Sequence, residues 1–112
     1  MPATLNYVEL GGGDLAATKR FYAEALGLAW TDYGPTYAAA EEGGVALGLQ
    51  GVASEAEAAP LAIFQVDDVE AAVGRVEAAG GAITVPLFSF PGGRRFHFRD
   101  PAGNVLGCWQ PA

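Results

Sequence analysis

The sequence predicts an α+β fold built from two tandem βαβββ modules, and three observations support this prediction. The chain has 112 residues, the usual size of one domain and too short for two independent cores. It contains an internal repeat, in which each copy reads as a strand, an acidic cap, an amphipathic helix and a glycine stop. Each copy continues into short segments separated by turn residues, which is typical of antiparallel strands.

The two copies align when Asp14 is placed on Asp68. The first copy starts at the strand-like Tyr7-Val-Glu-Leu, and the second starts at Leu61-Ala-Ile-Phe-Gln-Val. Because both copies carry the same order of signals over nearly the same length, we expect each to form the same supersecondary unit.

We expect a single domain over residues 1–112. Repeat 1 covers about 5–50 and repeat 2 about 61–110. The connector at 51–60 is small, polar and charged, and we expect it to be flexible.

The first helix is predicted over Leu15–Leu26. Asp14 can accept a hydrogen bond from the free amides of the first turn, and Gly27 can adopt the left-handed conformation that ends a helix. Spacings of three and four place four side chains on the face that packs on the sheet: Leu15, Thr18, Tyr22 and Leu26.

The second helix is predicted over Val69–Ala79, with Gly80-Gly81 as its stop. Asp67 with Glu70 three residues later resembles a capping box, although Asp68 competes for the cap position. The inward face is expected to hold Val69, Ala72, Val73 and Val76.

After each helix, the pattern predicts three strands. In the first copy they lie at 29–33, 36–40 and 45–50, and the alanine-rich middle one has the weakest strand signal. In the second copy they lie at 82–85, 94–99 and 104–109, with a tight Asp100-Pro-Ala-Gly turn between the last two.

Composition and charge limit the partners. Thirteen acidic and six basic residues give a net charge of -7, which repels phosphate backbones and anionic lipid, so neither nucleic acid nor a membrane is expected as a partner. Cys108 is the only cysteine, which excludes an intramolecular disulfide and fits a reducing compartment. No signal-like or membrane-spanning run is found in the sequence, so a cytoplasmic location is expected.

Two motifs resemble the vicinal oxygen chelate superfamily, the group of glyoxalases, bleomycin resistance proteins and extradiol dioxygenases. The first is Asp14-Leu15 followed by Phe21-Tyr22 and Leu26-Gly27-Leu28, and the second is Phe98-Arg-Asp100-Pro101-Ala-Gly103-Asn104. The resemblance extends from about Tyr7 to Trp109. It implies a half-open barrel with helices on the convex side, a ligand on the concave face, and a homodimer in which the modules can be exchanged between chains.

The resemblance also implies where a divalent metal would be held, at one position on the first and last strand of each repeat. These positions fall on Tyr7, Gly48, Leu61 and Gly107. Leucine and glycine side chains offer no donor atom, and a neutral tyrosine is a poor ligand. No metal cofactor is therefore expected, although a displaced divalent site involving Glu9 and Gln65 stays open.

Strand alternation divides the residues between two faces. The helix-packed side is expected to hold Val8, Leu10, Ala62, Phe64, Val66, Leu106 and Cys108. The concave side is expected to form the ligand site from Tyr7, Glu9, Leu61, Ile63, Gln65, Gly107 and Trp109. An apolar, aromatic set with few polar groups suits a small hydrophobic or aromatic molecule.

Several roles stay open at this point. Glu9 could be a general base, a hydrogen-bond acceptor for a ligand or a solvated group at the sheet edge, and the last is the default. Trp109 could contact a ligand or cover a core or dimer seam. The sequence does not decide whether Arg95, His97 and Arg99 face the ligand side, and solvent is favoured for the arginines.

The favoured function is metal-free binding of a small hydrophobic or aromatic molecule, as in bleomycin resistance proteins. The first alternative is a lyase, isomerase or dioxygenase-type enzyme that uses an unusual metal site or Glu9 as a base. The second is a non-catalytic structural module whose cavity is filled by its own side chains. The ligand itself cannot be identified from the sequence.

Overall fold

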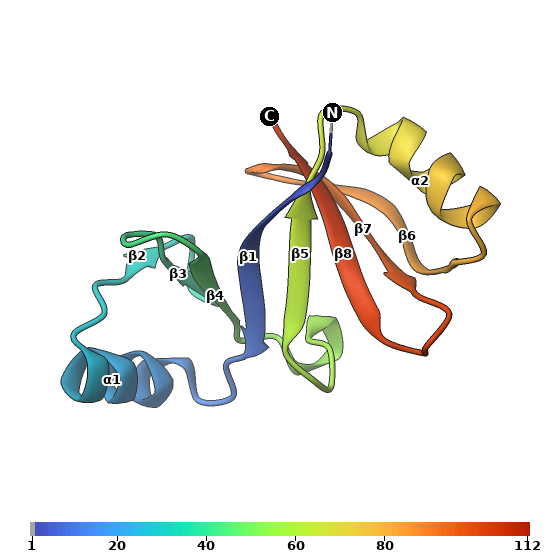
Figure 1. Ribbon diagram of the computed structural model, residues 1–112. Coiled ribbons are helices and arrows are strands. Elements are labelled where there is room, and N and C mark those ends of the chain that lie inside the picture. The colour runs from blue at the N-terminus through green and yellow to red at the C-terminus, as the bar shows by residue number, and fades with distance from the viewer. Residues whose placement is uncertain (1) are drawn as a thin grey trace. The chain divides into compact units, whose positions relative to one another are not determined.

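The computed structural model describes residues 2–112, and it divides into two compact units. The N-terminal unit is Asn6–Leu61, and the C-terminal unit is Ala62–Ala112 together with residues 2–5. Strand, helix and three further strands follow one another twice along the chain (Figure 1). The predicted α+β fold of two βαβββ modules is confirmed.

The N-terminal module contains a four-stranded mixed sheet. Its strands lie side by side in the order β2-β3-β4-β1, with β1 parallel to β4 and the other neighbours antiparallel. Its elements are β1 (Thr4–Gly11), α1 (Leu15–Leu26), β2 (Thr31–Asp32), β3 (Tyr37–Ala40) and β4 (Ala46–Gln50).

Helix α1 has the predicted bounds and caps. The amide of Ala17 donates to the Asp14 side chain at 3.1 Å, and Gly27 has the left-handed φ of 71°. The prediction that Leu26 faces the sheet was wrong, because this side chain is 67% exposed. Leu26 occupies the last turn, where the chain leaves the helix, and no residue of α1 is fully buried.

The alanine-rich strand β3 is a buried strand despite its weak strand propensity. Ala38 and Ala39 are 0% and 1% exposed, and Ala38 pairs with Leu49 of β4. Burial and pairing with β4 outweigh the low intrinsic preference of alanine for strands.

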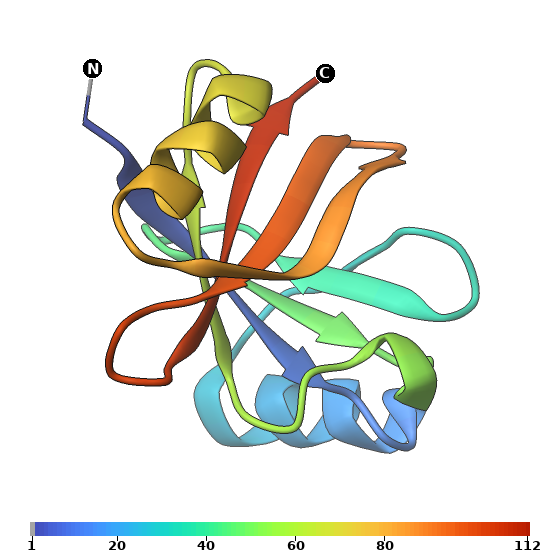
Figure 2. The ribbon, with the colours of Figure 1, turned by 90° about the vertical axis from the view of Figure 1, so that its right-hand side faces the viewer.

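The C-terminal module repeats the arrangement, with the strand order β5-β8-β7-β6 (Figure 2). Strand β5 is parallel to β8, and the β7–β8 and β6–β7 pairs are antiparallel. Its elements are β5 (Leu61–Gln65), α2 (Val69–Ala78), β6 (Ala82–Phe90), β7 (Gly93–Arg99) and β8 (Val105–Pro111).

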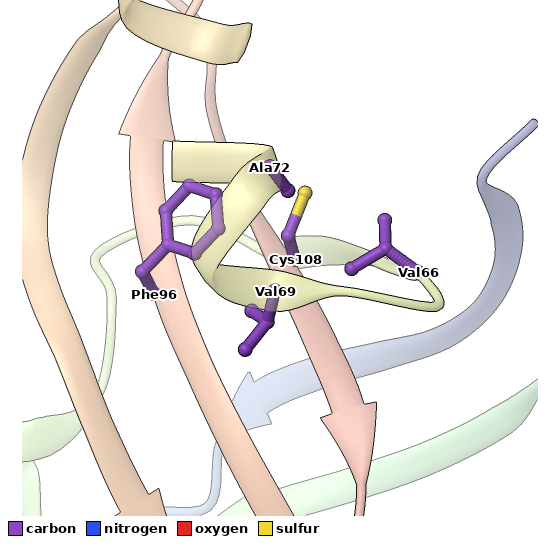
Figure 3. Close-up of a cluster of buried hydrophobic side chains, with 5 residues drawn as sticks. All are labelled: Val66, Val69, Ala72, Phe96 and Cys108. Carbon is purple, nitrogen blue, oxygen red and sulfur yellow. The ribbon is translucent and has the colours of Figure 1, made fainter. Parts of the chain in front are cut away.

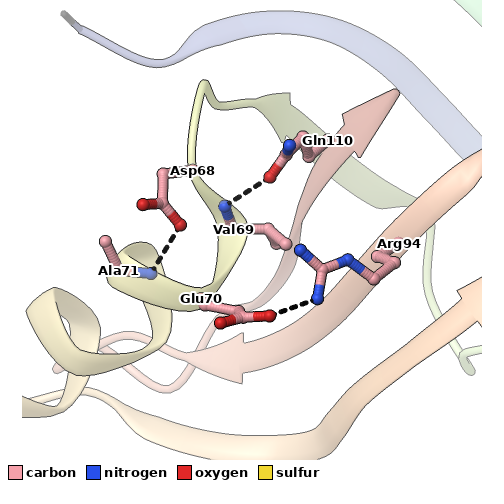
Figure 4. Close-up of polar contacts among 6 residues, drawn as sticks. All are labelled: Asp68, Val69, Glu70, Ala71, Arg94 and Gln110. Atoms are coloured by element: carbon pink, nitrogen blue, oxygen red, sulfur yellow. Dashed lines mark hydrogen bonds and ion pairs between the residues drawn. The ribbon is translucent and has the colours of Figure 1, made fainter. Parts of the chain in front are cut away.

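Helix α2 begins at the competing cap, not at the capping box. Asp68 accepts from the amide of Ala71 at 3.0 Å, and Asp67 lies outside the helix. Glu70 forms an ion pair with Arg94 of β7 instead of reaching back to the cap (Figure 4). The Asp67–Glu70 capping box was therefore wrong.

A hydrophobic core lies between α2 and one face of the C-terminal sheet. Phe96 of β7 and Cys108 of β8 point toward the helix (Figure 3). Burial raises the pKa of the Cys108 thiol to about 11, so this group stays neutral. The core consists of Val66, Val69, Ala72, Phe96 and Cys108, with Phe64 packed against it.

Several strands differ in length from the prediction. Strand β2 spans only two residues, whereas β6 continues to Phe90, beyond the predicted end at residue 85. Register shifts interrupt the pairing of β6 with β7, which hides the strand from a simple alternation pattern. The connector contains a short 3₁₀ turn, Ala53–Glu55.

The Asp100 turn closes the β7–β8 hairpin. Asn104 donates to Asp100 through its backbone and side-chain nitrogens, each at 2.9 Å. These hydrogen bonds lower the pKa of the Asp100 carboxyl.

Over residues 2–112, no helix has the length and apolar character needed to cross a bilayer.

Candidate functional site

Three polar side chains of the N-terminal module meet on one face of its sheet and form what we call the tyrosine–glutamate cluster: Tyr7, Glu9 and Tyr37. The Tyr37 hydroxyl donates to the Glu9 carboxylate at 2.7 Å and lies 2.7 Å from the Tyr7 hydroxyl. Since Tyr37 uses its proton on Glu9, it accepts the proton of Tyr7. The result is a fixed chain of hydrogen bonds that ends on a carboxylate.

Glu9 is the buried member of this half-buried cluster, so the default prediction for Glu9 was wrong. The side chain is 3% exposed, so Glu9 is not a solvated group at the sheet edge. A buried carboxylate is costly unless it is hydrogen bonded, and Tyr37 provides such a bond.

The Tyr37 hydroxyl is held in its neutral form. Burial, followed by the charge of Glu9, raises the pKa of Tyr37 above its ordinary value of 10.0. Tyr37 therefore remains a hydrogen-bond donor over the physiological pH range, and it does not act as an anionic metal ligand.

The cluster also occupies the space next to Gly48. Gly48 pairs with Glu9 across β1 and β4. A Cβ atom at this position would lie 2.8 Å from a ring carbon of Tyr7 and closer still to the hydroxyls of Tyr7 and Tyr37. Real Cβ atoms essentially never approach other heavy atoms this closely, so no larger side chain fits at Gly48 without a rearrangement.

The residues at the four metal positions do not fit a divalent ion. The first is Tyr7, whose hydroxyl is engaged by Tyr37. Gly48 has no donor and no space for one, Leu61 is a hydrocarbon, and a Cβ at Gly107 would lie 3.3 Å from Ile63. Within residues 2–112, no three His, Cys, Asp or Glu side chains are placed to hold a metal ion.

In the C-terminal module, the sheet face opposite α2 carries two rows of residues. One row runs across β6, β7, β8 and β5 as Phe88, Arg95, Trp109 and Gln65. The neighbouring row is Val85, His97, Gly107 and Ile63. Side chains in such rows are direct cross-strand neighbours.

Two aromatic rings lie beside the guanidinium of this face and contact further rings, and together they form what we call the aromatic–arginine cluster: Phe88, Phe90, Arg95, His97 and Trp109. The Arg95 Cζ atom lies 5.3 Å from the ring centre of Phe88 and 5.8 Å from that of Phe90. The Phe90 and Trp109 ring centres are 6.5 Å apart, and those of Phe88 and His97 are 6.1 Å apart. These distances are typical of cation–π and aromatic contacts.

The structure decides the face of the three basic side chains. Arg95 and His97 lie on the face that carries Gln65 and Trp109, and His97 is only 2% exposed. The favoured solvent position was therefore wrong for Arg95, whose charge is stabilised by the rings beside it. It holds for Arg99, which is exposed at the end of β7.

Sequence reasoning missed three residues of these clusters. Tyr37 lies in a predicted strand, but only the pairing of β3 with β4 shows that it reaches Gly48. Phe88 and Phe90 lie beyond the predicted end of their strand. The only local signal for these two residues was the short apolar–polar–apolar run Phe88-Ser-Phe90, which follows the register shifts of β6.

A family model matches residues 4–107, and its description is the Glyoxalase/Bleomycin resistance protein/Dioxygenase superfamily. The chain belongs to this superfamily. The resemblance found in the sequence is thereby confirmed, and the βαβββ repeat is the shared architecture.

Among curated proteins, the glyoxylase-like protein CFP32 of Mycobacterium bovis (strain ATCC BAA-935 / AF2122/97) is 32% identical over 120 residues. The match covers 96% of this chain and 45% of CFP32. The chain therefore spans about half the length of this relative.

Two solved structures are similar to this chain in fold. An NAD-dependent benzaldehyde dehydrogenase structure from Legionella pneumophila has a TM-score of 0.77 at 21% identity, covering 96% of this chain and 99% of its own. A superfamily member from Vibrio splendidus 12B01 has a TM-score of 0.69 at 18% identity, covering 97% of this chain and 99% of its own. At these identities the likeness concerns the fold.

Proposed function

We propose that this protein binds a small aromatic molecule without a metal ion, using the aromatic–arginine cluster of its C-terminal module. The observation that carries the proposal is the arrangement of three aromatic rings and one guanidinium on a single sheet face. Flat apolar surfaces beside a few oriented polar groups are what small-molecule sites use. Ile63 and Gln65 lie on the same face and would contribute contact and orientation.

The absence of a metal is supported by the donor set. None of the four family positions carries an imidazole or a carboxylate, and tyrosine hydroxyls fill the space beside Gly48. At Tyr7 and Gly48, the tyrosine–glutamate cluster supplies hydroxyls that are hydrogen bonded to each other and to Glu9. We also propose that the protein is located in the cytoplasm, as expected from its single cysteine.

The test is calorimetric binding of a neutral aromatic probe, 2-naphthamide, measured in the presence of a chelator. Binding is expected with the same affinity with or without the chelator. Trp109→Leu is expected to weaken it roughly fivefold, because a ring contact is lost. Trp30→Leu is the matched control, since the Trp30 indole donates to the Lys19 carbonyl in the other module.

Two results would contradict the proposal. One is loss of binding on chelation, which would indicate a metal-dependent site. The other is absence of binding by any aromatic probe, which would favour a structural module filled by its own side chains.

A second candidate function is proton transfer by Glu9. The observation that favours it is a carboxylate that is 3% exposed and oriented by the Tyr37 hydroxyl, an arrangement that suits a general base. Deuterium incorporation from solvent into an added carbonyl compound would reveal such chemistry. Glu9→Gln should abolish the exchange, and exchange that persists in this variant would exclude the role.

We also propose a homodimer. Phe21 and Leu26 of α1 are 59% and 67% exposed, and large apolar side chains exposed on one helix favour contact with a second chain. Exchange of modules through the connector at 51–60 is compatible with this proposal. Sedimentation at micromolar concentration should give twice the chain mass, and Phe21→Glu should give monomers. A monomeric wild-type protein would contradict the proposal.

A further inference from the structure

The guanidinium of Arg95 lies on the face of the C-terminal sheet opposite α2. It lies beside the rings of both Phe88 and Phe90, one strand away. A guanidinium is a planar fork of N–H donors that matches the two oxygens of a carboxylate, and aromatic rings beside it stabilise its charge. Arg95 also makes interactions beyond these ring contacts, so a ligand would exchange with an existing partner.

The other basic side chains with defined partners are used differently. Lys19 forms an ion pair with Asp32, and Arg94 forms one with Glu70. Both pairs are between helix and strand and lie toward the surface, where ion pairs have structural roles of small energy. Arg95 instead lies among rings.

The surroundings of Arg95 would also contact an aromatic ligand. Trp109 is its direct neighbour on β8, and Phe88 is its direct neighbour on β6. Gln65 follows Trp109 in the same row, and its side-chain amide can hydrogen bond to an oxygen atom of a bound ligand. A flat surface and a positive charge therefore lie within one cross-strand row.

We infer that the preferred ligands are aromatic carboxylates, with the carboxylate on the Arg95 guanidinium and the ring against Trp109 and the two phenylalanines. This inference rests on the proposed function, because it names the chemical class bound at the same face. The net charge of -7 disfavours anions in general, so the affinity for a carboxylate has to come from this local cation.

The experiment compares two probes of nearly the same shape, 2-naphthoate and 2-naphthamide. Naphthoate is expected to bind roughly tenfold more tightly, because a charge-assisted pair replaces a neutral one. Arg95→Gln should remove this difference by weakening naphthoate alone. Arg99→Gln, an exposed arginine on the same strand, is the control and should change neither affinity.

A salt series keeps the inference testable if Arg95→Gln fails to fold. In the wild-type protein, naphthoate binding should weaken as salt is raised, and naphthamide binding should not. Equal affinities of both probes, with no salt effect, would overturn the inference and leave the proposed function standing. Failure of both probes to bind would overturn the two together.

Discussion

At the scale of single residues, the space beside Gly48 is already filled by neighbouring side chains. The space of a Cβ is taken by the hydroxyls of Tyr7 and Tyr37, and Tyr37 in turn holds Glu9. The positions of these three side chains therefore depend on one another and on the absence of a side chain at Gly48. A change at any of them should be felt by the others.

Removal of the Tyr37 hydroxyl should destabilise the protein. Tyr37→Phe takes a donor from a buried carboxylate, and the free energy of unfolding is expected to fall by about 1.5–3 kcal/mol. Tyr33→Phe is the matched control, because its hydroxyl donates to Glu41 at the surface and should contribute less than about 1 kcal/mol. Equal effects in urea unfolding would contradict the buried hydrogen-bond chain.

Local signals allowed accurate prediction of some residues but not of others. Asp14, Gly27 and the bounds of α1 follow from interactions within four residues, which the sequence displays directly. The partnership of Tyr37 with Glu9 joins residues 28 positions apart, and it depends on strand order and register. Register is set by tertiary packing, so this part of the site was not accessible from one sequence.

At the scale of elements, the C-terminal module is fixed by α2 on its sheet. Asp68 caps the helix, Gln110 of β8 accepts from the amide of Val69 at 2.9 Å, and Glu70 pairs with Arg94 of β7 (Figure 4). These contacts connect the first turn of α2 to two strands. They orient the sheet whose opposite face carries the aromatic–arginine cluster.

The two neighbouring aspartates at the start of α2 should therefore differ. Asp68→Ala removes the cap, and a loss of about 0.5–2 kcal/mol of unfolding free energy is expected. Asp67→Ala should change stability by less than about 0.5 kcal/mol, since Asp67 is exposed and lies outside the helix. A larger stability loss for Asp67→Ala than for Asp68→Ala in denaturant unfolding would instead favour the capping box of Asp67 with Glu70.

Strand lengths show why element boundaries were harder to predict than element order. The two βαβββ copies were predicted from repeated caps and turns, which are local. The extension of β6 to Phe90 depends on pairing with β7 across two register shifts. The aromatic face it contributes was missed for this reason.

At the scale of the whole molecule, the neutral Cys108 thiol and Tyr37 hydroxyl make the stability of the fold depend on alkaline pH. The pKa of Cys108 is raised from 9.0 to about 11, chiefly by burial, and that of Tyr37 is raised above 10.0. The unfolded chain releases these protons first, so unfolding is favoured as the pH rises. The contribution is intact below pH 9 and is lost progressively as pH rises through the folded-state values.

Unfolding free energies measured from pH 8 upward should therefore fall above about pH 9. The decline should be smaller in Cys108→Ala and in Tyr37→Phe, because each variant lacks one of the two groups. A profile that is flat to pH 11 in the wild-type protein, or an unaltered decline in both variants, would contradict this assignment.

Our central proposal is that the four family metal positions of this chain hold no divalent ion. The most direct measurement is a titration of chelator-treated, dialysed protein with Mn²⁺, Ni²⁺ and Zn²⁺, followed by calorimetry and by metal analysis after gel filtration. We predict no stoichiometric binding, with far less than one ion retained per chain. One ion retained per chain, and lost in Glu9→Gln, would contradict the proposed metal-free binding.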